Sequence, residues 1–263
     1  MSLRRTIKYH LENFYYKKKF RGAFNFEDFK IKDNKFSGKK LNIIFLSYFN
    51  GPYTYNNTLE VLREFGNVFD FEMTRIPHEK DWYKNNKKNI ANEKMLEFVD
   101  STIKINKIDV IVCYLSGHST TLKTLEKIKS YGIPMINEAL DDERKFVSRK
   151  GKDGIKRGLR DVCKYFTLSL TTSKSAIIKY IVEGGNPMYK DYAGNEKIYR
   201  NLNLRKEYDV GFVGASYGIR SKYIEYLRNN GINVYAKGIG WDEGIATDDE
   251  MIEIFNKSKI VLG

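Results

Sequence analysis

Short apolar runs alternate with segments of helical period along most of the chain. The run LNIIFLSY, residues 41–48, is apolar on both faces, and TLEVLREFG, residues 58–66, has a helical pattern. A buried parallel strand followed by a helix produces this pattern. Further strands are expected at 67–74, 107–117, 133–140 and 165–173, and helices at 92–106, 120–132 and 175–185. The alternation predicts βαβ crossovers and a doubly wound parallel sheet.

A second strand–turn–helix unit begins after a polar, turn-rich stretch at 186–207. Strands are expected at 208–213, 232–236 and 259–263, and helices at 220–230 and 247–258. Thr247 and Glu250 have the spacing of a capping box. So small a parallel sheet leaves an unpaired edge and an uncovered face. We therefore expect the second domain to be incomplete, and Gly263 not to be its natural end.

These elements predict an α/β protein with two Rossmann-like parallel-sheet domains. With 263 residues, 41% of them hydrophobic, the chain is long and apolar enough for two cores. The expected organisation is a basic N-terminal extension at 1–40, an N-terminal domain at 41–200, and the start of a C-terminal domain at 201–263.

The formal net charge of +13 predicts an anionic partner. It does not choose among polyanions, anionic membrane surfaces and phosphorylated substrates. The dense basic cluster is the first forty residues, where lysines mix with Phe and Tyr. One interpretation is a basic-aromatic arm that contacts a membrane surface or an anionic polymer. The other is a solvated helix followed by a linker.

Targeting and redox signals favour a cytoplasmic location, with peripheral contact at the inner membrane surface as an option for the basic N-terminus. No window has the roughly 18 apolar residues of a membrane span, and the N-terminus lacks the apolar region of a secretory signal. Cys113 and Cys163 lie in apolar contexts without metal-ligand spacing, so we expect neither a disulfide nor a zinc site. The chain carries no nucleic-acid recognition motif, and no nucleic-acid partner is expected.

Three loops that follow predicted strands are candidate sites. In open parallel sheets, ligands bind beyond the carboxyl ends of the strands, where turns and helix N-termini present N–H groups to anions. Asn50 and Gly51 follow the first strand, and His118 follows the strand that ends near residue 115. With an ordinary pKa of about 6.5, an imidazole there could take a proton from a substrate hydroxyl. The alternative is a surface or hydrogen-bonding histidine.

The third loop runs from Gly214 to Gly218. Its two glycines allow a tight turn, while Ser216 and the N-terminus of the following helix could face a diphosphate. Arg220 adds a planar guanidinium whose geometry suits phosphate oxygens. The pattern is neither the dinucleotide fingerprint nor the P-loop, so a glycine turn without a ligand is the alternative.

Carboxylates gather at NEALDDERKF, residues 137–146. Glu138, Asp141, Asp142 and Glu143 could form an acidic motif that holds Mg²⁺ or Mn²⁺ against a nucleotide diphosphate. Alternatively, Asp141 and Asp142 cap a following helix, where acidic residues favour the first turn. Either way, their position after a strand places them on the same rim as the other candidates.

Four stretches carry a resemblance to a known family. They are GIPMINEALDDERKF, LTTSKSAIIKYIVEGGNPMYKDYAGNEKIYR, YDVGFVGASYGIRSKYIEYLRNNGINVYAKGIGW and TDDEMIEIFNKSKIVL. In order and approximate spacing, the chain from residue 41 onward resembles bacterial glycosyltransferases similar to the spore-maturation protein CgeB. The resemblance implies a GT-B-like fold, in which two Rossmann-like domains bind the acceptor mainly on the first and the nucleotide-sugar donor mainly on the second.

The resemblance implies roles for particular residues. Donor binding is expected at Gly214, Ser216, Tyr217, Gly218, Arg220, Gly238, Gly240 and Trp241, the last three matching a G-x-G-W pattern. Acceptor-side loops are expected at Asn50, Gly51, Asp141 and Asp142, with His118 as the catalytic base if the reaction inverts configuration. In the family, the chain continues past KIVL into a helix with a donor-binding glutamate, which this sequence does not include.

The expected function is therefore transfer of a sugar from a nucleotide-sugar to a polysaccharide, glycolipid or protein acceptor. Helix dipoles and Arg220 would stabilise the departing diphosphate, so we expect no metal and no tightly bound cofactor. The alternative is a non-catalytic module, derived from a glycosyltransferase fold, that binds a glycan or another partner through its basic surface.

Overall fold

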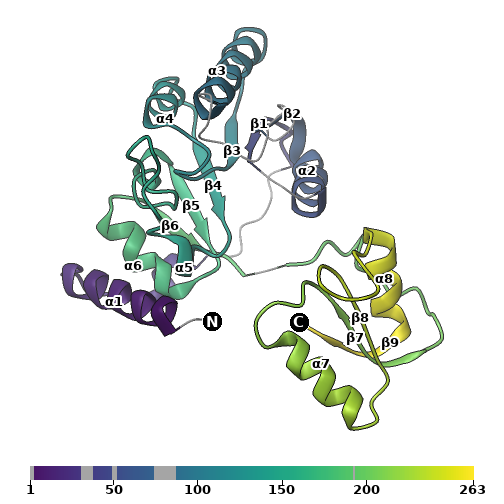
Figure 1. Cartoon of the computed structure of the whole chain (residues 1–263). Coiled ribbons are helices and arrows are strands. Elements are labelled where there is room, and N and C mark those ends of the chain that lie inside the picture. The colour runs from purple at the N-terminus through teal and green to yellow at the C-terminus, as the bar shows by residue number, and fades with distance from the viewer. Residues whose placement is uncertain (1–2, 31–37, 49–51, 74–86, 192) are drawn as a thin grey trace. The chain divides into compact units, whose positions relative to one another are not determined.

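The computed structural model describes residues 3–30, 38–48, 52–73, 87–191 and 193–263 (Figure 1). The chain forms two compact units, one up to residue 192 and the other over Ala193–Gly263. Each unit has its own parallel sheet and its own core.

The first unit is built on a six-stranded, fully parallel sheet. Its strand order is β2-β1-β3-β4-β5-β6. The strands are β1 (Leu41–Ser47), β2 (Gly66–Glu72), β3 (Val110–Tyr114), β4 (Met135–Ala139), β5 (Leu168–Thr171) and β6 (Pro187–Tyr189). The helices that follow them are α2 (Pro52–Phe65), α3 (Lys87–Ile105), α4 (Leu122–Lys129), α5 (Asp142–Lys145) and α6 (Lys174–Val182), with a 3-10 turn at Cys163–Tyr165.

Helices cover both faces of this sheet (Figure 1). Along β1, Ile44 and Leu46 point into the large core shared with α3 and α4, while Phe45 packs against α2 through Leu59. Successive side chains of a strand face opposite sides, so a strand buried on both faces needs the continuous apolar run seen here. This is the physical reason that the first strand could be recognised from sequence.

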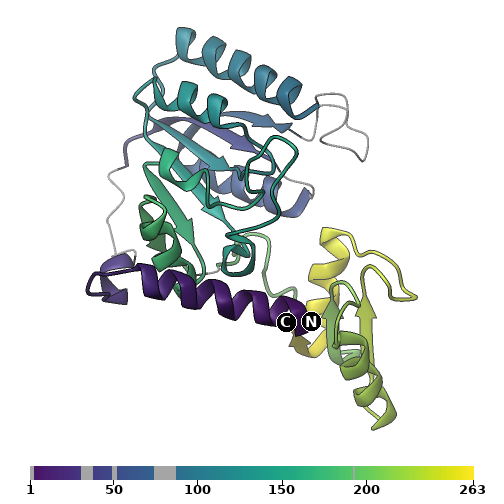
Figure 2. The same ribbon diagram turned by 60° about the vertical axis from the view of Figure 1, so that its left-hand side comes forward.

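The N-terminal helix α1 (Leu3–Lys19) packs on the outside of the first unit, beside α6 (Figure 2). Tyr16 is buried against Phe146, and its hydroxyl donates a hydrogen bond to Glu183 at 2.8 Å. Glu12 forms an ion pair of 2.8 Å with Lys179, which is fully buried. The helix is therefore docked on the α/β unit through one face, and it is not the fully solvated helix of the second interpretation. A 3-10 turn follows it at Phe26–Phe29.

The second unit has a three-stranded parallel sheet of order β8-β7-β9. It comprises β7 (Tyr208–Val213), α7 (Arg220–Asn229), β8 (Val234–Lys237), α8 (Asp248–Lys257) and β9 (Ser258–Leu262). Val210, Phe212, Ile224, Val234 and Ala236 form its core. The predicted capping box is present, because Thr247 and Glu250 each accept a hydrogen bond from the other's backbone N–H.

The expected fold class is confirmed: the protein is α/β, with a six-stranded parallel sheet and a second, smaller one. One strand was not anticipated. β6, of three residues, begins at Pro187 inside the stretch interpreted as a connection, and it pairs with β5 at the edge of the sheet.

Candidate functional site

The sheet of the first unit has a topological switch point between β1 and β3. The chain leaves β1 to form β2 on one side, and β3 then lies on the other side of β1. In open parallel sheets, the two connections diverge at such a point and leave a crevice outside the carboxyl ends of the strands. Tyr48 directly follows β1, and His118 comes four residues after β3. The topology thus directs both side chains to the place where ligands bind in this class of fold.

Tyr48 and His118 contact each other there. The Tyr48 hydroxyl lies 3.2 Å from Nε2 of His118, and the tautomer of the imidazole decides which group donates. The two rings meet edge to face, with centroids 5.2 Å apart. Burial and the nearby charges of Arg157 and Lys88 lower the pKa of His118 to about 4, while Asp153 opposes the shift. Burial also raises the pKa of Tyr48. At neutral pH the pair is uncharged, and the surroundings that keep the imidazole neutral also make it a weaker base than an exposed histidine.

Side chains of α3 bond to the loop that carries His118. The Lys88 ammonium is buried and donates to the carbonyl oxygen of Gly117 at 2.8 Å, while forming an ion pair of 2.6 Å with Asp153. On the other side, the N–H groups of Gly117 and His118 donate to the carbonyls of Gly158 and Arg157, at 2.8 and 3.0 Å. A Cβ at Gly117 would collide with the carbonyl oxygen of Lys156, so this close approach requires glycine.

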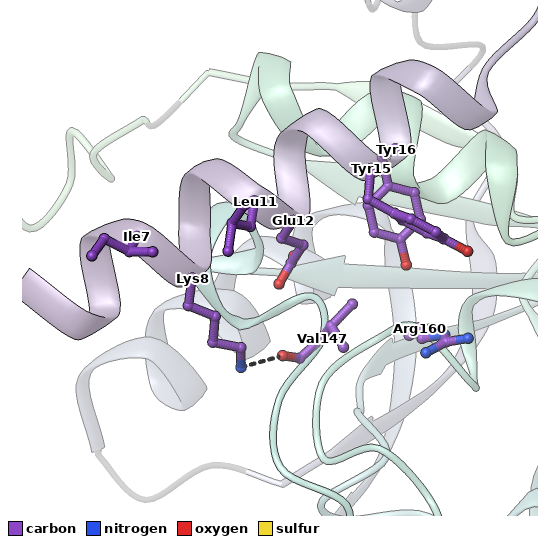
Figure 3. Close-up of a pocket in the computed structure, with 8 residues that line it drawn as sticks. All are labelled: Ile7, Lys8, Leu11, Glu12, Tyr15, Tyr16, Val147 and Arg160. Carbon is purple, nitrogen blue, oxygen red and sulfur yellow. Dashed lines mark hydrogen bonds between the residues drawn. The ribbon is translucent and has the colours of Figure 1, made fainter.

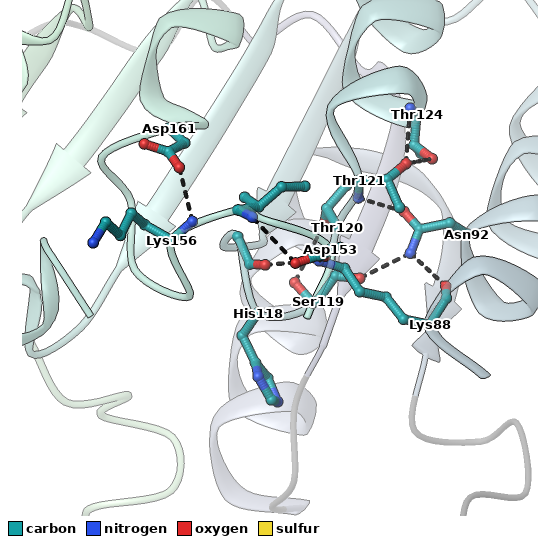
Figure 4. Close-up of polar contacts among 12 residues, drawn as sticks. Lys88, Asn92, His118, Ser119, Thr120, Thr121, Thr124, Asp153, Lys156 and Asp161 are labelled. Atoms are coloured by element: carbon teal, nitrogen blue, oxygen red, sulfur yellow. Dashed lines mark hydrogen bonds and ion pairs between the residues drawn. The ribbon is translucent and has the colours of Figure 1, made fainter. Parts of the chain in front are cut away.

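Asn92, one turn after Lys88, completes the support of the loop (Figure 4). Its amide donates to the carbonyl of Ser119 at 2.9 Å, and its Oδ1 accepts from the N–H of Thr121 at 3.1 Å. Thr121 then caps α4 by accepting from the N–H of Thr124. Backbone groups of Gly117, His118, Ser119 and Thr121 are therefore bonded to neighbouring segments, and these bonds hold the backbone around His118.

The other predicted residues of the first unit lie in different surroundings. Asn50 and Gly51 are outside the described residues. Asp141 has a left-handed backbone before α5, and its exposed carboxylate pairs with Lys145 at 2.8 Å. Asp142 is buried and accepts a hydrogen bond from Tyr180 at 2.9 Å, and burial raises its pKa. Neither aspartate makes a side-chain cap, although α5 does start at Asp142.

In the second unit, the glycine turn after β7 is bonded to the turn after β8. Ser216 donates its hydroxyl hydrogen to the carbonyl of Gly240 at 3.0 Å, and the Trp241 indole donates to the carbonyl of Gly214 at 2.7 Å. Gly238 has φ of 139°, and a Cβ there would collide with the backbone of Gly214. The two predicted donor-binding segments are thus brought together at the carboxyl edge of the sheet.

Arg220 and Tyr217 lie at the start of α7. The Arg220 guanidinium stacks over the Tyr217 ring, 4.3 Å from its centroid, and donates to the carbonyl of Ala215 at 3.1 Å. Tyr217 is exposed, and no side chain caps the helix at Ile219. The first N–H groups of α7 have no partners within the helix, so this end of the second unit offers N–H donors beside a fixed cation. Gly218 supplies the positive φ of 73° that leads into the helix.

Sequence reasoning missed several residues of the first site. Tyr48 could have been found, because it is the last residue of the first predicted strand and so lies at that strand's carboxyl end. Lys88, Asn92, Asp153 and Arg157 gave no local signal, since their roles depend on contacts across 27 to 65 positions of sequence. The i, i+4 spacing of Lys88 and Asn92 places them on one helix face, but many exposed pairs share that spacing.

Within the described ranges, no three His, Cys, Asp or Glu side chains converge into a group that could hold a metal ion. Every helix in those ranges is too short or too polar to span a bilayer.

Comparisons with known proteins give distant structural likenesses. No family model and no curated protein sequence matches the chain. Among solved structures, one similar chain is the lipopolysaccharide outer core galactosyltransferase WaaB in its apo form, with 13% identity, a TM-score of 0.41, and coverage of 85% of this chain and 69% of that one. Another is a carbohydrate transporter from Acidothermus cellulolyticus 11B in complex with myo-inositol, with 12% identity, a TM-score of 0.26, and coverage of 76% and 74%. The fold assignment therefore rests on the two parallel sheets themselves.

Proposed function

We propose that the chain is a glycosyltransferase, or the N-terminal part of one, of the CgeB-like kind that its sequence resembles. It would transfer a sugar from a nucleotide-sugar to a polysaccharide, glycolipid or protein acceptor. The observation that carries the proposal is the contact between His118 and Tyr48 at the switch point of the first sheet. The position of this neutral imidazole, rather than its basicity, suits removal of a proton from an acceptor hydroxyl, because burial lowers its pKa.

In this proposal, the first unit binds the acceptor and activates it. The acceptor hydroxyl gives its proton to the imidazole of His118, which is neutral above about pH 4. The oxygen then bonds to the anomeric carbon of the donor sugar. The bond from that carbon to the diphosphate breaks, and its electron pair leaves with the nucleoside diphosphate. This role for His118 belongs to a reaction that inverts the anomeric configuration.

The second unit would bind the nucleotide-sugar. The N-terminus of α7 and the guanidinium of Arg220 would stabilise the negative charge of the leaving diphosphate, and the Ser216 and Gly240 turns would shape the site. Since these groups supply the positive charge, we propose that no metal is required. Nucleotide binding is then expected to be the same with and without EDTA.

Calorimetric titration with uridine diphosphate and other nucleoside diphosphates tests this function. We expect binding by this chain, or by a longer natural form of it, and a loss of about tenfold to a hundredfold in affinity for Arg220→Gln, because hydrogen bonds to a charged group are worth about 1.5–3 kcal/mol. Lys206→Gln, at an exposed lysine that precedes β7 and lies outside α7, is the matched control and should change affinity by less than about twofold.

In a Trp82→Phe background, Trp241 fluorescence checks that the turn is intact in Arg220→Gln, because the Trp241 indole is bonded to Gly214 within that turn. Glycan binding without a response to any nucleoside diphosphate, in either form of the chain, would contradict the proposal. That result would identify a non-catalytic glycan-binding module instead.

A further inference from the structure

The apolar stripe of α1 faces away from the unit on which the helix is docked. Ile7, Leu11 and Phe14 are spaced i, i+4 and i+7, which places them on one face of the helix. Their exposed fractions are 50%, 64% and 67%. In a surface helix of a globular protein, such a stripe ordinarily faces the core. Its outward position here leaves a row of large apolar side chains in contact with solvent.

The opposite face of α1 makes the contacts with the first unit, and these contacts are mostly polar. The Tyr9 hydroxyl donates to Glu143, and Glu12 pairs with buried Lys179. Tyr16 donates to Glu183. Because three side chains along the helix are held in this way, the outward stripe is presented in a fixed orientation. No folding step is then needed before it binds a partner.

The charges around the stripe are positive. Lys8, Lys17, Lys18 and Lys19 are exposed. Between residues 3 and 21 the sequence has one acidic residue, Glu12, and its side chain is turned inward and only 10% exposed. The outward side of the helix therefore combines apolar side chains with cations and shows no carboxylate.

A groove runs beside the stripe (Figure 3). It has a volume of about 490 Å³, and Ile7, Leu11, Tyr15 and Val147 supply apolar walls. Its charged lining is Lys8, Arg160, which pairs with Glu183 at 3.4 Å, and Glu12, which pairs with Lys179. Lys8 donates to the carbonyl of Val147 at 3.1 Å, which keeps its ammonium at the groove. The apolar surface thus continues from the helix onto the α/β unit, and Lys8 is the cation at its edge that no carboxylate of the groove pairs with in the described contacts.

We propose that α1 is a peripheral membrane anchor that lies on an anionic bilayer. Ile7, Leu11 and Phe14 would enter the boundary between headgroups and acyl chains, and the exposed lysines would contact lipid phosphates. Charge complementarity favours an anionic lipid surface as the occupant, because a helix with apolar side chains and lysines on one side matches the chemistry of such a surface. The proposal does not depend on the nucleotide-binding function of the second unit.

Co-sedimentation of the whole chain with lipid vesicles tests this anchor. We expect binding to vesicles of phosphatidylcholine and phosphatidylglycerol, weak binding to phosphatidylcholine alone, and release by salt. Lys17→Gln together with Lys18→Gln should lower the partition coefficient by about 25-fold, or about fivefold for each lysine. Leu11→Ser together with Phe14→Ser should lower it by more than about tenfold, since both side chains would leave the lipid phase.

Matched control variants test whether loss of any exposed aromatic side chains or lysines, outside α1, also weakens vesicle binding. Tyr223→Ser with Tyr226→Ser removes two side chains of α7 that are 60% and 65% exposed. Lys152→Gln with Lys222→Gln removes two exposed lysines outside α1. Both pairs should leave vesicle binding within about twofold of the unchanged protein. Circular dichroism verifies that each variant is folded.

Three results would overturn the anchor: no binding to anionic vesicles, equal binding to neutral ones, or equal losses in the control variants. Sedimentation velocity tests whether a second copy of this chain, rather than a membrane, binds the stripe. If the protein forms dimers that Leu11→Ser with Phe14→Ser dissociates, and does not bind vesicles, the stripe is a self-association surface. Nucleoside diphosphate binding should be unchanged in the α1 variants, so the two proposals fail or stand separately.

Discussion

His118 shows how its surroundings change an ordinary side chain. Its imidazole is half-buried beside Tyr48, and the cations Arg157 and Lys88 act on it from neighbouring elements. Loss of hydration and repulsion by like charge both disfavour the imidazolium, so the pKa falls to about 4. A titratable group with a perturbed pKa, at the carboxyl ends of parallel strands, is a good candidate for function. The same pKa shift makes the free energy of unfolding depend on pH.

Replacing His118 by Gln should reduce the acid sensitivity of the fold. The pKa is about 4 in the folded chain and 6.5 as the ordinary value, so between these pH values the unfolded state binds more protons. Stability from this source is therefore complete above pH 6.5 and declines as the pH falls toward 4. We expect the wild-type protein to lose about 1–2 kcal/mol more than His118→Gln over this range, after allowance for the exposed part of the ring.

Urea unfolding of both proteins at several pH values measures this difference. His10→Gln, at an exposed histidine of α1, is the control and should retain the wild-type pH dependence. Parallel pH profiles for wild type and His118→Gln would show that the imidazole is not excluded from protonation in the folded state.

At the scale of elements, the loop between β3 and α4 depends on α3. Lys88 reaches the loop from one helix turn and Asn92 from the next, and together they bond to Gly117, Ser119 and Thr121. A buried ammonium is costly to desolvate, and burial does lower the pKa of Lys88. The carboxylate of Asp153 and the Gly117 carbonyl offset this cost, so the three groups act as one unit.

Two lysine–aspartate pairs of similar length should differ strongly in their effect on stability. Lys88–Asp153, at 2.6 Å, is buried on the lysine side, while Lys145–Asp141, at 2.8 Å, is exposed on both sides. Lys88→Met leaves Asp153 and the Gly117 carbonyl without the ammonium and should cost about 3 kcal/mol. Lys145→Met should cost about 0.5 kcal/mol or less. Chemical denaturation gives the free energy of unfolding of both variants. Equal losses of stability would show that burial does not set the contribution of the Lys88–Asp153 pair.

Sequence periodicity predicted the elements with a strong apolar repeat. The strand at 208–213 was predicted at its observed bounds, and the first strand to within one residue. β6 was missed because three residues starting with proline have no measurable period. The docked position of α1 was also missed, since its contacts use Tyr, Glu and Lys side chains whose partners lie more than 130 positions away. Long-range polar contacts of this kind leave no local pattern.

At the scale of the whole molecule, the two units have cores of very different size. Among the described residues, the main core of the first unit contains 24 buried hydrophobic residues and that of the second contains five. Stability rises with the apolar surface that a unit buries, so the second unit is expected to be the weaker one. Two separate cores also imply two separate cooperative transitions.

Two core truncations should each shift one of these transitions. Trp241 packs on Phe212 in the second unit, and in a Trp82→Phe background its fluorescence reports that unit alone. Ile224→Ala should lower the urea midpoint seen by Trp241, with a loss of about 2–4 kcal/mol, and leave the later transition seen by circular dichroism in place. Ile128→Ala, in the first core, should do the reverse. If either variant moves both transitions together, the two units unfold as one cooperative structure, because stability lost in one core would then be shared by the other.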